Sequence, residues 1–211
     1  MGFTLDPLAI PPILFALCFH EFSHAYVAFR LGDPTAAEQG RLTLNPLRHL
    51  DPMGTLLLFF AGFGWARPVP VDPDHLRDPR RDMLWIAAAG PLSNIALALA
   101  SGLLLRMAVP VLPGGEIAVA VGTMLLFSVQ INLVLAFFNA IPLPPLDGSS
   151  ILRGLLPLRQ AYAWSRIDRY GPLVLFGLVA SGFVFGVSLL WLIIGVPVKF
   201  FTTAFTFGLL G

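Results

Sequence analysis

Charged residues are scarce in this chain of 211 residues: Asp, Glu, Lys and Arg together make up 12% of it. Soluble domains typically contain about 25% charged residues. Hydrophobic residues make up 56% of the chain, and the few basic residues form no basic domain that could hold nucleic acid. The composition therefore indicates a multi-pass integral membrane protein and gives no support to nucleic-acid binding.

Cysteine is nearly absent as well. Cys18 is the single cysteine, which excludes a disulfide within the chain. It lies two positions before His20 and thus on another helix face, so we expect it to pack rather than bind metal. Residues 1–12 contain no basic segment and do not resemble a cleaved signal peptide. We expect a single integral membrane domain over residues 1–211.

Four apolar segments are long enough to cross a membrane as helices: residues 11–31, 83–107, 117–138 and 173–196. Residues 54–64 are apolar but too few to span, so we expect a re-entrant or interfacial segment. Residues 41–44 alternate in polarity, and the prolines in 65–71 favour extended backbone. The predicted fold is an all-α polytopic membrane protein with a small membrane-associated β hairpin.

Basic residues are distributed unevenly between the two sides of these four spans. One side holds only Arg106 and Lys199, whereas the other holds Arg30, Arg41, Arg48, Arg67, Arg77, Arg80, Arg81, Arg153, Arg159, Arg166 and Arg169. By the positive-inside rule, the arginine-rich side is cytoplasmic and the N-terminus lies outside. We expect a location in the plasma (inner) membrane of a prokaryote.

The first predicted span contains the pattern His-Glu-x-x-His at residues 20–24. His20 and His24, four residues apart, lie on one helix face and can bind one metal ion, and Glu21 is placed to accept a proton from an attacking water. Ionisable groups at membrane depth cost about 2.5–3.5 kcal/mol on insertion scales and usually mark function. The pattern predicts a zinc hydrolase site about 10 Å below the membrane surface. The alternative, polar side chains merely packed between helices, requires all three to be there by chance.

A catalytic zinc site takes three protein ligands. His49 and His75 lie in the polar loop between the first two spans, where solvated or turn residues are expected. Asp147 follows a proline-rich stretch that should be extended and should lie near the depth of His24. From the residues alone, Asp147 is either the third ligand or the N-cap of the helix that follows.

Together and in order, the stretches 20–24, 40–46, 65–71 and 139–148 resemble the site-2 protease family of intramembrane zinc metalloproteases. The resemblance covers about residues 15–154. We expect no helix before the metal-binding one, no PDZ-like insertion and no CBS-like domain in this chain. The chain therefore resembles the minimal branch of that family.

The resemblance implies one Zn²⁺ per chain, with Asp147 as its third ligand and Glu21 as the catalytic base. It implies that Asn139 and Asn94 contribute to binding the substrate or its oxyanion. The expected activity is hydrolysis of a peptide bond near the cytoplasmic end of a transmembrane protein substrate in the lipid bilayer. Two alternatives are a zinc-dependent membrane hydrolase acting on a lipid-linked substrate and a non-catalytic metal-binding membrane protein.

Overall fold

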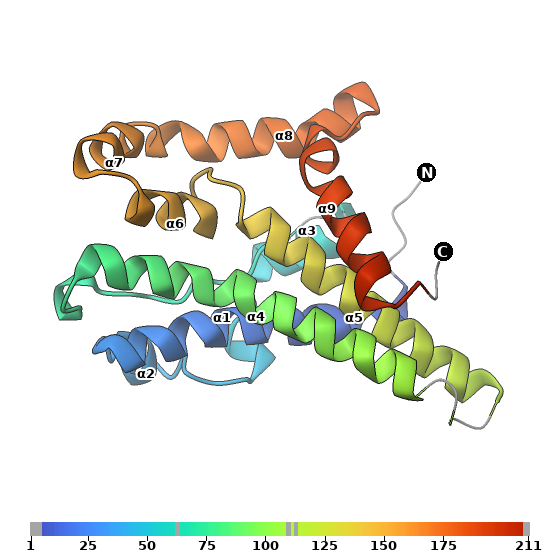
Figure 1. Cartoon of the computed structure of the whole chain (residues 1–211). Coiled ribbons are helices and arrows are strands. Elements are labelled where there is room, and N and C mark those ends of the chain that lie inside the picture. Colours follow the sequence, from blue (N-terminus) through green and yellow to red (C-terminus); the bar gives the residue numbers. More distant parts are fainter. Residues whose placement is uncertain (1–5, 62–63, 109–110, 112–113, 209–211) are drawn as a thin grey trace.

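Three long helices form the centre of the molecule (Figure 1). The computed structural model describes residues 6–61, 64–108, 111 and 114–208. Within these ranges, α1 (Ile10–Leu31), α4 (Pro79–Ala108) and α5 (Glu116–Asn139) pack against one another. The same three helices are the described ones that are long and apolar enough to cross a membrane, with α1 extended by the short helix η1 (Pro7–Ala9).

Local sequence signals set the ends of these helices. The Asp6 carboxylate accepts a hydrogen bond from the Leu8 N–H at the start of η1, and Gly32, with φ of 115°, ends α1 in the left-handed conformation. α4 starts four residues before the predicted span because Asp78 and Asp82 form a reciprocal cap. Asp78 Oδ1 accepts from the Arg81 N–H, and the Asp78 N–H donates to Asp82 Oδ2.

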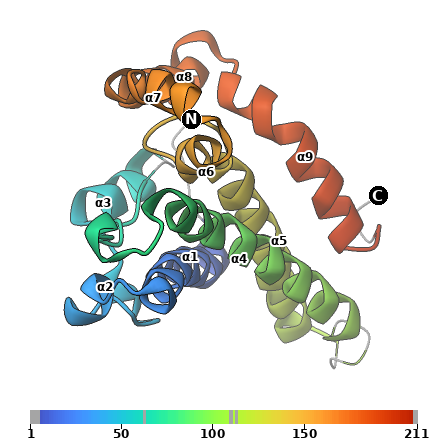
Figure 2. The same cartoon turned by 60° about the vertical axis from the view of Figure 1, so that its left-hand side comes forward.

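The predicted fourth span, residues 173–196, is two helices rather than one. α8 (Gly171–Phe185) ends at Gly186, whose φ of 68° stops the helix, and α9 (Leu189–Phe205) begins after Ser188, whose hydroxyl caps the Trp191 N–H. The chain turns between them, so α9 packs against α5 and the C-terminal part of α4 (Figures 1 and 2). With 15 and 17 residues, each helix is shorter than the roughly 20 residues of a full span.

The predicted β hairpin is not formed by the described residues, which contain no β strand. The backbone of the extended residues 65–71 pairs with residues 49–50 rather than 41–44, through an isolated antiparallel bridge between Leu50 and Ala66. The Arg67 N–H donates to the His49 carbonyl over 2.7 Å. Pro68 and Pro70 have no N–H, which prevents a longer ladder at this edge.

The apolar segment predicted over residues 54–64 is the helix α3 (Pro52–Ala61), of ten residues and about 15 Å. That length is too short to cross the membrane, as expected. Residues 62–63 of the prediction lie outside the described part of the chain. Gly54 of α3 lies directly against the backbone of Trp65, so α3 packs on the start of the extended segment 65–71.

The remaining helices are short and lie largely toward the left of Figure 1, at the C-terminal end of α1 and the N-terminal end of α4. They are α2 (Thr35–Glu38), η2 (Pro46–Arg48), η3 (Pro73–His75), α6 (Asp147–Leu155), α7 (Leu158–Ser165) and η4 (Asp168–Tyr170). The buried apolar core joins α4, α5 and α9 through Ala98, Val129, Leu133, Ile194 and Val198. This core leaves the polar side chains of α1 to face α4 and α6.

Candidate metal and catalytic site

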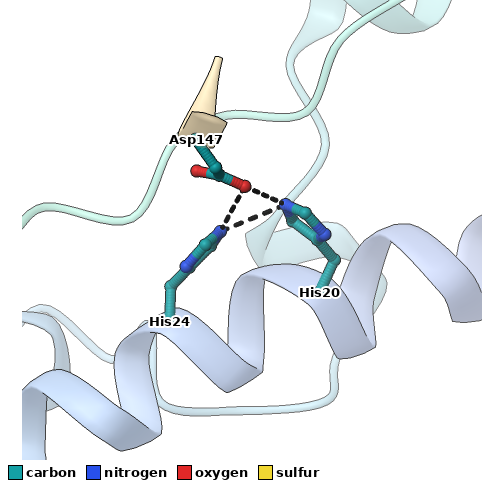
Figure 3. Close-up of side chains that lie close together, drawn as sticks. All are labelled: His20, His24 and Asp147. Atoms are coloured by element: carbon teal, nitrogen blue, oxygen red, sulfur yellow. Dashed lines mark hydrogen bonds and ion pairs between the residues drawn. The ribbon is translucent and has the colours of Figure 1, made fainter. Parts of the chain in front are cut away.

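Three side chains from two distant parts of the sequence converge inside the helical bundle (Figure 3). His20 and His24 come from α1, and Asp147 is the first residue of α6. The two Nε2 atoms lie 3.1 Å apart. Asp147 Oδ2 lies 3.2 Å from His20 Nε2 and 3.3 Å from His24 Nε2. Among the described residues this is the one group of histidine, cysteine and carboxylate side chains arranged to hold a metal ion.

The spacing of these three atoms fits a tetrahedral zinc ion. Zinc binds histidine nitrogen and carboxylate oxygen at about 2.0–2.2 Å, which in a tetrahedron separates neighbouring ligand atoms by about 3.3–3.6 Å. The three separations in the structure, 3.1–3.3 Å, fall within a few tenths of an ångström of that value. Three protein ligands leave the fourth tetrahedral position for water or substrate.

Hydrogen bonds behind the histidines determine which ring nitrogen faces the centre. His24 Nδ1 lies 2.7 Å from the carbonyl oxygen of Ile86, which can only accept, so Nδ1 carries the proton. His20 Nδ1 lies 2.6 Å from Asn94 Oδ1, which also can only accept, so this Nδ1 carries a proton too. Both Nε2 atoms therefore direct lone pairs at one another and at Asp147 Oδ2, which is buried and accepts no hydrogen bond from any described residue. With the imidazoles in these tautomers, a cation between the three atoms would be bound by all of them.

The orientation of the Asn94 amide is fixed by a chain of polar groups that crosses the bundle. Asn94 Nδ2 donates to Asn132 Oδ1 over 2.8 Å and to the Ala16 carbonyl over 3.3 Å. Asn132 Nδ2 in turn donates to the Ser128 carbonyl over 2.8 Å. Asn94 and Asn132 are fully buried. Asn94 thus uses its oxygen on His20 and its nitrogen inside the bundle, and it is not among the residues that line the cavity at the site.

Gly90 lets α4 approach both histidines. A Cβ atom at this position would lie 2.5 Å from His20 Cε1 and 2.5 Å from His24 Nε2. Contacts this short do not occur between real atoms, so any larger residue at 90 would displace the imidazoles. Gly90 and Asn94, four residues apart, form one face of α4, with the glycine giving space and the amide giving orientation.

The position of Asp147 depends on the stretch that precedes it. Leu146 is extended and occupies the N-cap position of α6, and Asp147 is the first helical residue, so the N-cap interpretation of Asp147 is wrong. Gly148 lies against the carbonyl oxygens of Ala140 and Ile141, where a Cβ would clash. This close contact brings the start of α6 against the end of α5 and directs the Asp147 carboxylate toward α1 (Figure 3).

The site opens into a cavity of about 1080 Å³ between α1, α4, α6, α8 and the extended segment 65–71. Glu21 and Asn139 line it together with the three converging side chains. Glu21 Oε2 accepts a hydrogen bond from the Val69 N–H over 3.1 Å. Asn139 Nδ2 donates to the Leu135 carbonyl one turn earlier in α5. The rest of the lining is largely apolar, including Leu57, Trp65, Phe138, Leu175 and Phe176.

The other histidines and the cysteine lie away from the cluster. His49 is buried, and its Nε2 donates to the Thr43 carbonyl over 2.7 Å. His75 is half exposed and lies 3.4 Å from the buried carboxylate of Asp33. Cys18 is buried on α1. Asn132 was not among the residues expected at the site, although an amide inside a 24-residue apolar helix is a signal that can identify such a residue.

Comparison with known proteins gives matches of one kind. A family model described as peptidase family M50 matches residues 104–181. YwhC of Bacillus subtilis is 43% identical over 175 residues, which cover 81% of this chain and 79% of that protein. Rip2 of Mycobacterium tuberculosis H37Rv is 33% identical over 182 residues, which cover 75% and 68%. MJ0611 of Methanocaldococcus jannaschii is 33% identical over 137 residues, which cover 64% and 63%.

These three relatives each carry the provisional name of a zinc metalloprotease. No solved structure matches the chain. The similarity to YwhC extends over more than two thirds of both proteins, and the family match includes the stretch from Asn139 to Asp147. The grouped side chains of His20, His24 and Asp147 suit the metal that those names specify. The chain is an integral membrane protein that belongs to peptidase family M50, the site-2 protease family of zinc metalloproteases.

Proposed function

We propose that this metalloprotease hydrolyses a peptide bond within a transmembrane helix of a membrane-protein substrate, close to the cytoplasmic end of that helix. The observation that carries the proposal is the convergence of His20, His24 and Asp147 on α1 and α6, inside a bundle of membrane-length helices. Membership of a protease family favours this reaction over the two alternatives, a lipid-linked substrate and a non-catalytic metal protein.

In the proposed reaction, His20, His24 and Asp147 hold one zinc ion. Bound zinc polarises the scissile carbonyl and makes the attacking water more acidic. Glu21 accepts the proton from that water and delivers it to the leaving amine. The Val69 N–H holds Glu21 Oε2, which leaves Oε1 for proton transfer. Asn139 lines the same cavity, and the second N–H of its amide would donate to the developing oxyanion.

The cavity supports a substrate that is both apolar and extended. Its largely apolar lining suits the side chains of a membrane-spanning segment. A helix hides its carbonyl groups in its own hydrogen bonds, so the substrate has to unwind before the scissile carbonyl can approach Glu21. The cavity volume of about 1080 Å³ leaves room for a short unwound stretch, and residues of the extended segment 65–71 form part of its wall.

The proposed orientation rests on the arginines. Arg30 lies near the C-terminal end of α1, Arg80 and Arg81 lie at the N-terminal end of α4, and α6 and α7 carry Arg153 and Arg159; these ends and helices lie toward one side of the molecule, at the left of Figure 1. By the positive-inside rule that side is cytoplasmic, in the plasma membrane of a prokaryotic cell. His24 lies seven residues, or about 10 Å, from the end of α1 on that side, so water has a short path to the site.

Metal content of purified variants tests the ligand set. His20→Ala, His24→Ala and Asp147→Ala should each lose stoichiometric zinc, because an open three-ligand site has no spare ligand. His75→Ala is the matched control and should retain one zinc per chain, since His75 lies outside the cluster. Stoichiometric zinc in the Asp147→Ala protein would remove Asp147 from the site and with it the proposed function.

A further inference from the structure

Arg41 is a charged residue buried inside the membrane-protein body: its relative exposure is 5%. Its backbone is anchored by a 2.7 Å hydrogen bond from its N–H to the carbonyl of Ala36 in α2. A buried guanidinium is costly unless its donors are used. Arg41 Nη2 donates to the carbonyl oxygens of Arg67, over 2.6 Å, and Pro68, over 3.3 Å. The side chain therefore binds the backbone of the extended segment 65–71.

The same short backbone stretch binds the proposed catalytic base. The Arg67 N–H donates to the His49 carbonyl, the Arg67 and Pro68 carbonyls accept from Arg41, and the next N–H, that of Val69, donates to Glu21 Oε2. Three consecutive residues are thus held on one side by the 41–49 loop and on the other by α1. The position of the Val69 N–H depends on what holds the two carbonyls before it.

Arg41 acts from outside the cavity. Pro68, Val69 and Glu21 line the cavity, and Arg41 reaches the far side of this wall through the carbonyls of Arg67 and Pro68. Burial and the nearby Arg67 lower the pKa of Arg41, whereas the charge of Glu21 raises it. A guanidinium nevertheless stays protonated in proteins, so Nη2 of Arg41 remains a donor to both carbonyls.

We propose that Arg41 is a positioning residue for Glu21. By binding the carbonyls of Arg67 and Pro68, it fixes the Val69 N–H at the distance at which that group orients the Glu21 carboxylate for proton transfer. This inference rests on the proposed role of Glu21 as the base. Without Arg41 the extended segment would shift, and the carboxylate would lose its fixed orientation while the zinc ligands stayed in place.

The test compares Arg41→Ala with Arg48→Ala, an exposed arginine of the same loop, in purified protein reconstituted with a transmembrane peptide substrate. A displacement of about 1 Å at a reacting group can cost about 100-fold in rate. We expect kcat to fall by about that factor in Arg41→Ala, with KM and zinc content unchanged. Arg48→Ala should match the wild type. Arg41→Lys keeps the charge without the planar fork and should recover part of the loss.

A double variant shows whether Arg41 acts through Glu21. In a Glu21→Gln background, Arg41→Ala should cause no further loss, because the group that it positions is already inactive. The proposal would be overturned if Arg41→Ala lowered kcat in the Glu21→Gln background by the same factor as in the wild type. Loss of zinc in both Arg41→Ala and Arg41→Lys would overturn it as well.

Hydrogen exchange separates this inference from the proposed function, since it needs no catalysis. The Val69 amide should exchange faster in Arg41→Ala and in Glu21→Ala than in the wild type and Arg48→Ala. A Val69 amide that exchanges at the wild-type rate in Arg41→Ala would refute the positioning role even if the enzyme cleaves peptides. If the exchange rates follow the expected pattern and the wild type holds zinc but cleaves no peptide, the proposed function is refuted instead.

Discussion

At His20 the placement of one proton decides whether a metal can bind. Nδ1 carries that proton because Asn94 Oδ1 accepts it, and Asn94 can turn only its oxygen toward His20 because Asn132 Oδ1 takes its nitrogen. The Nε2 lone pair is then directed at Asp147 and His24. Asn132, which contacts His20 only through Asn94, therefore helps to fix the tautomer and orientation of the His20 ring.

We predict that Asn132→Leu, which keeps the volume of the side chain but removes the amide, lowers zinc affinity by about 10–100-fold. The Asn94 amide would lose its stronger partner, leaving the longer bond to Ala16, and could no longer hold one orientation. Competition with a chelator measures the affinity. Ser128→Ala is the control, because Asn132 binds mainly the Ser128 backbone carbonyl. Equal affinities in the Asn132→Leu protein and the wild type would show that the chain of amides is not needed.

Sequence spacing identified the residues of the metal site better than the residues that orient them. His20, Glu21 and His24 follow from one helix face. The residues alone left Asp147 open between ligand and cap, and only its position as the first residue of α6 excludes the cap. The orientation of Asn94 depends on Asn132, 38 positions away in the sequence, and no local pattern reports such a contact.

Among the elements, α8 and α9 show that hydropathy does not locate a break within an apolar segment. The apolar character of residues 173–196 continues through the turn at Gly186, so the segment is typical of one span. The signals for a break, a glycine and the capping Ser188, were present but are also common inside spanning helices. For the extended segment 65–71, the prolines correctly indicated extended backbone, but its partner, residues 49–50, had no strand pattern.

The packing of α9 on the bundle depends on a glycine of α4. A Cβ at Gly102 would overlap the Phe205 carbonyl oxygen, whereas a Cβ at Gly177 of α8 would meet no atom within 4 Å. We predict that Gly102→Ala destabilises the protein by about 1–3 kcal/mol, as overpacking does. Gly177→Ala should be neutral or stabilising by up to about 1 kcal/mol. Thermal unfolding in detergent measures both, and a Gly102→Ala protein as stable as the wild type would mean that α9 does not pack closely here.

In the whole molecule, the bundle holds a polar site at one end of an apolar body. α1 carries two of the proposed ligands and the proposed base, α5 ends at Asn139, and α6 returns the chain to the same site with Asp147. The arginine-rich connections lie at that end (Figure 1). The arrangement predicts both the side of the membrane from which water arrives and the part of a substrate that reaches the site.

We predict that cleavage falls within the cytoplasmic third of the substrate helix. Gly, Asn or Pro near the cleaved bond should speed cleavage, because they lower the cost of unwinding: an interior Gly costs a helix about 1 kcal/mol and Pro about 3 kcal/mol. Leucine at those positions should slow cleavage without reducing membrane insertion. Mass spectrometry of the fragments locates the cleaved bond, and bonds cut mainly on the extracellular side would reverse the proposed orientation.

The most direct test of the account is Glu21→Gln, with zinc content and peptide cleavage measured on the same purified sample. Gln is nearly the size of Glu but cannot accept the proton, and it touches none of the three ligand atoms. The account predicts one zinc per chain in both proteins, cleavage of a reconstituted transmembrane substrate by the wild type, and a loss of several orders of magnitude in the variant. A zinc-loaded Glu21→Gln protein that cleaves the substrate at the wild-type rate would contradict it.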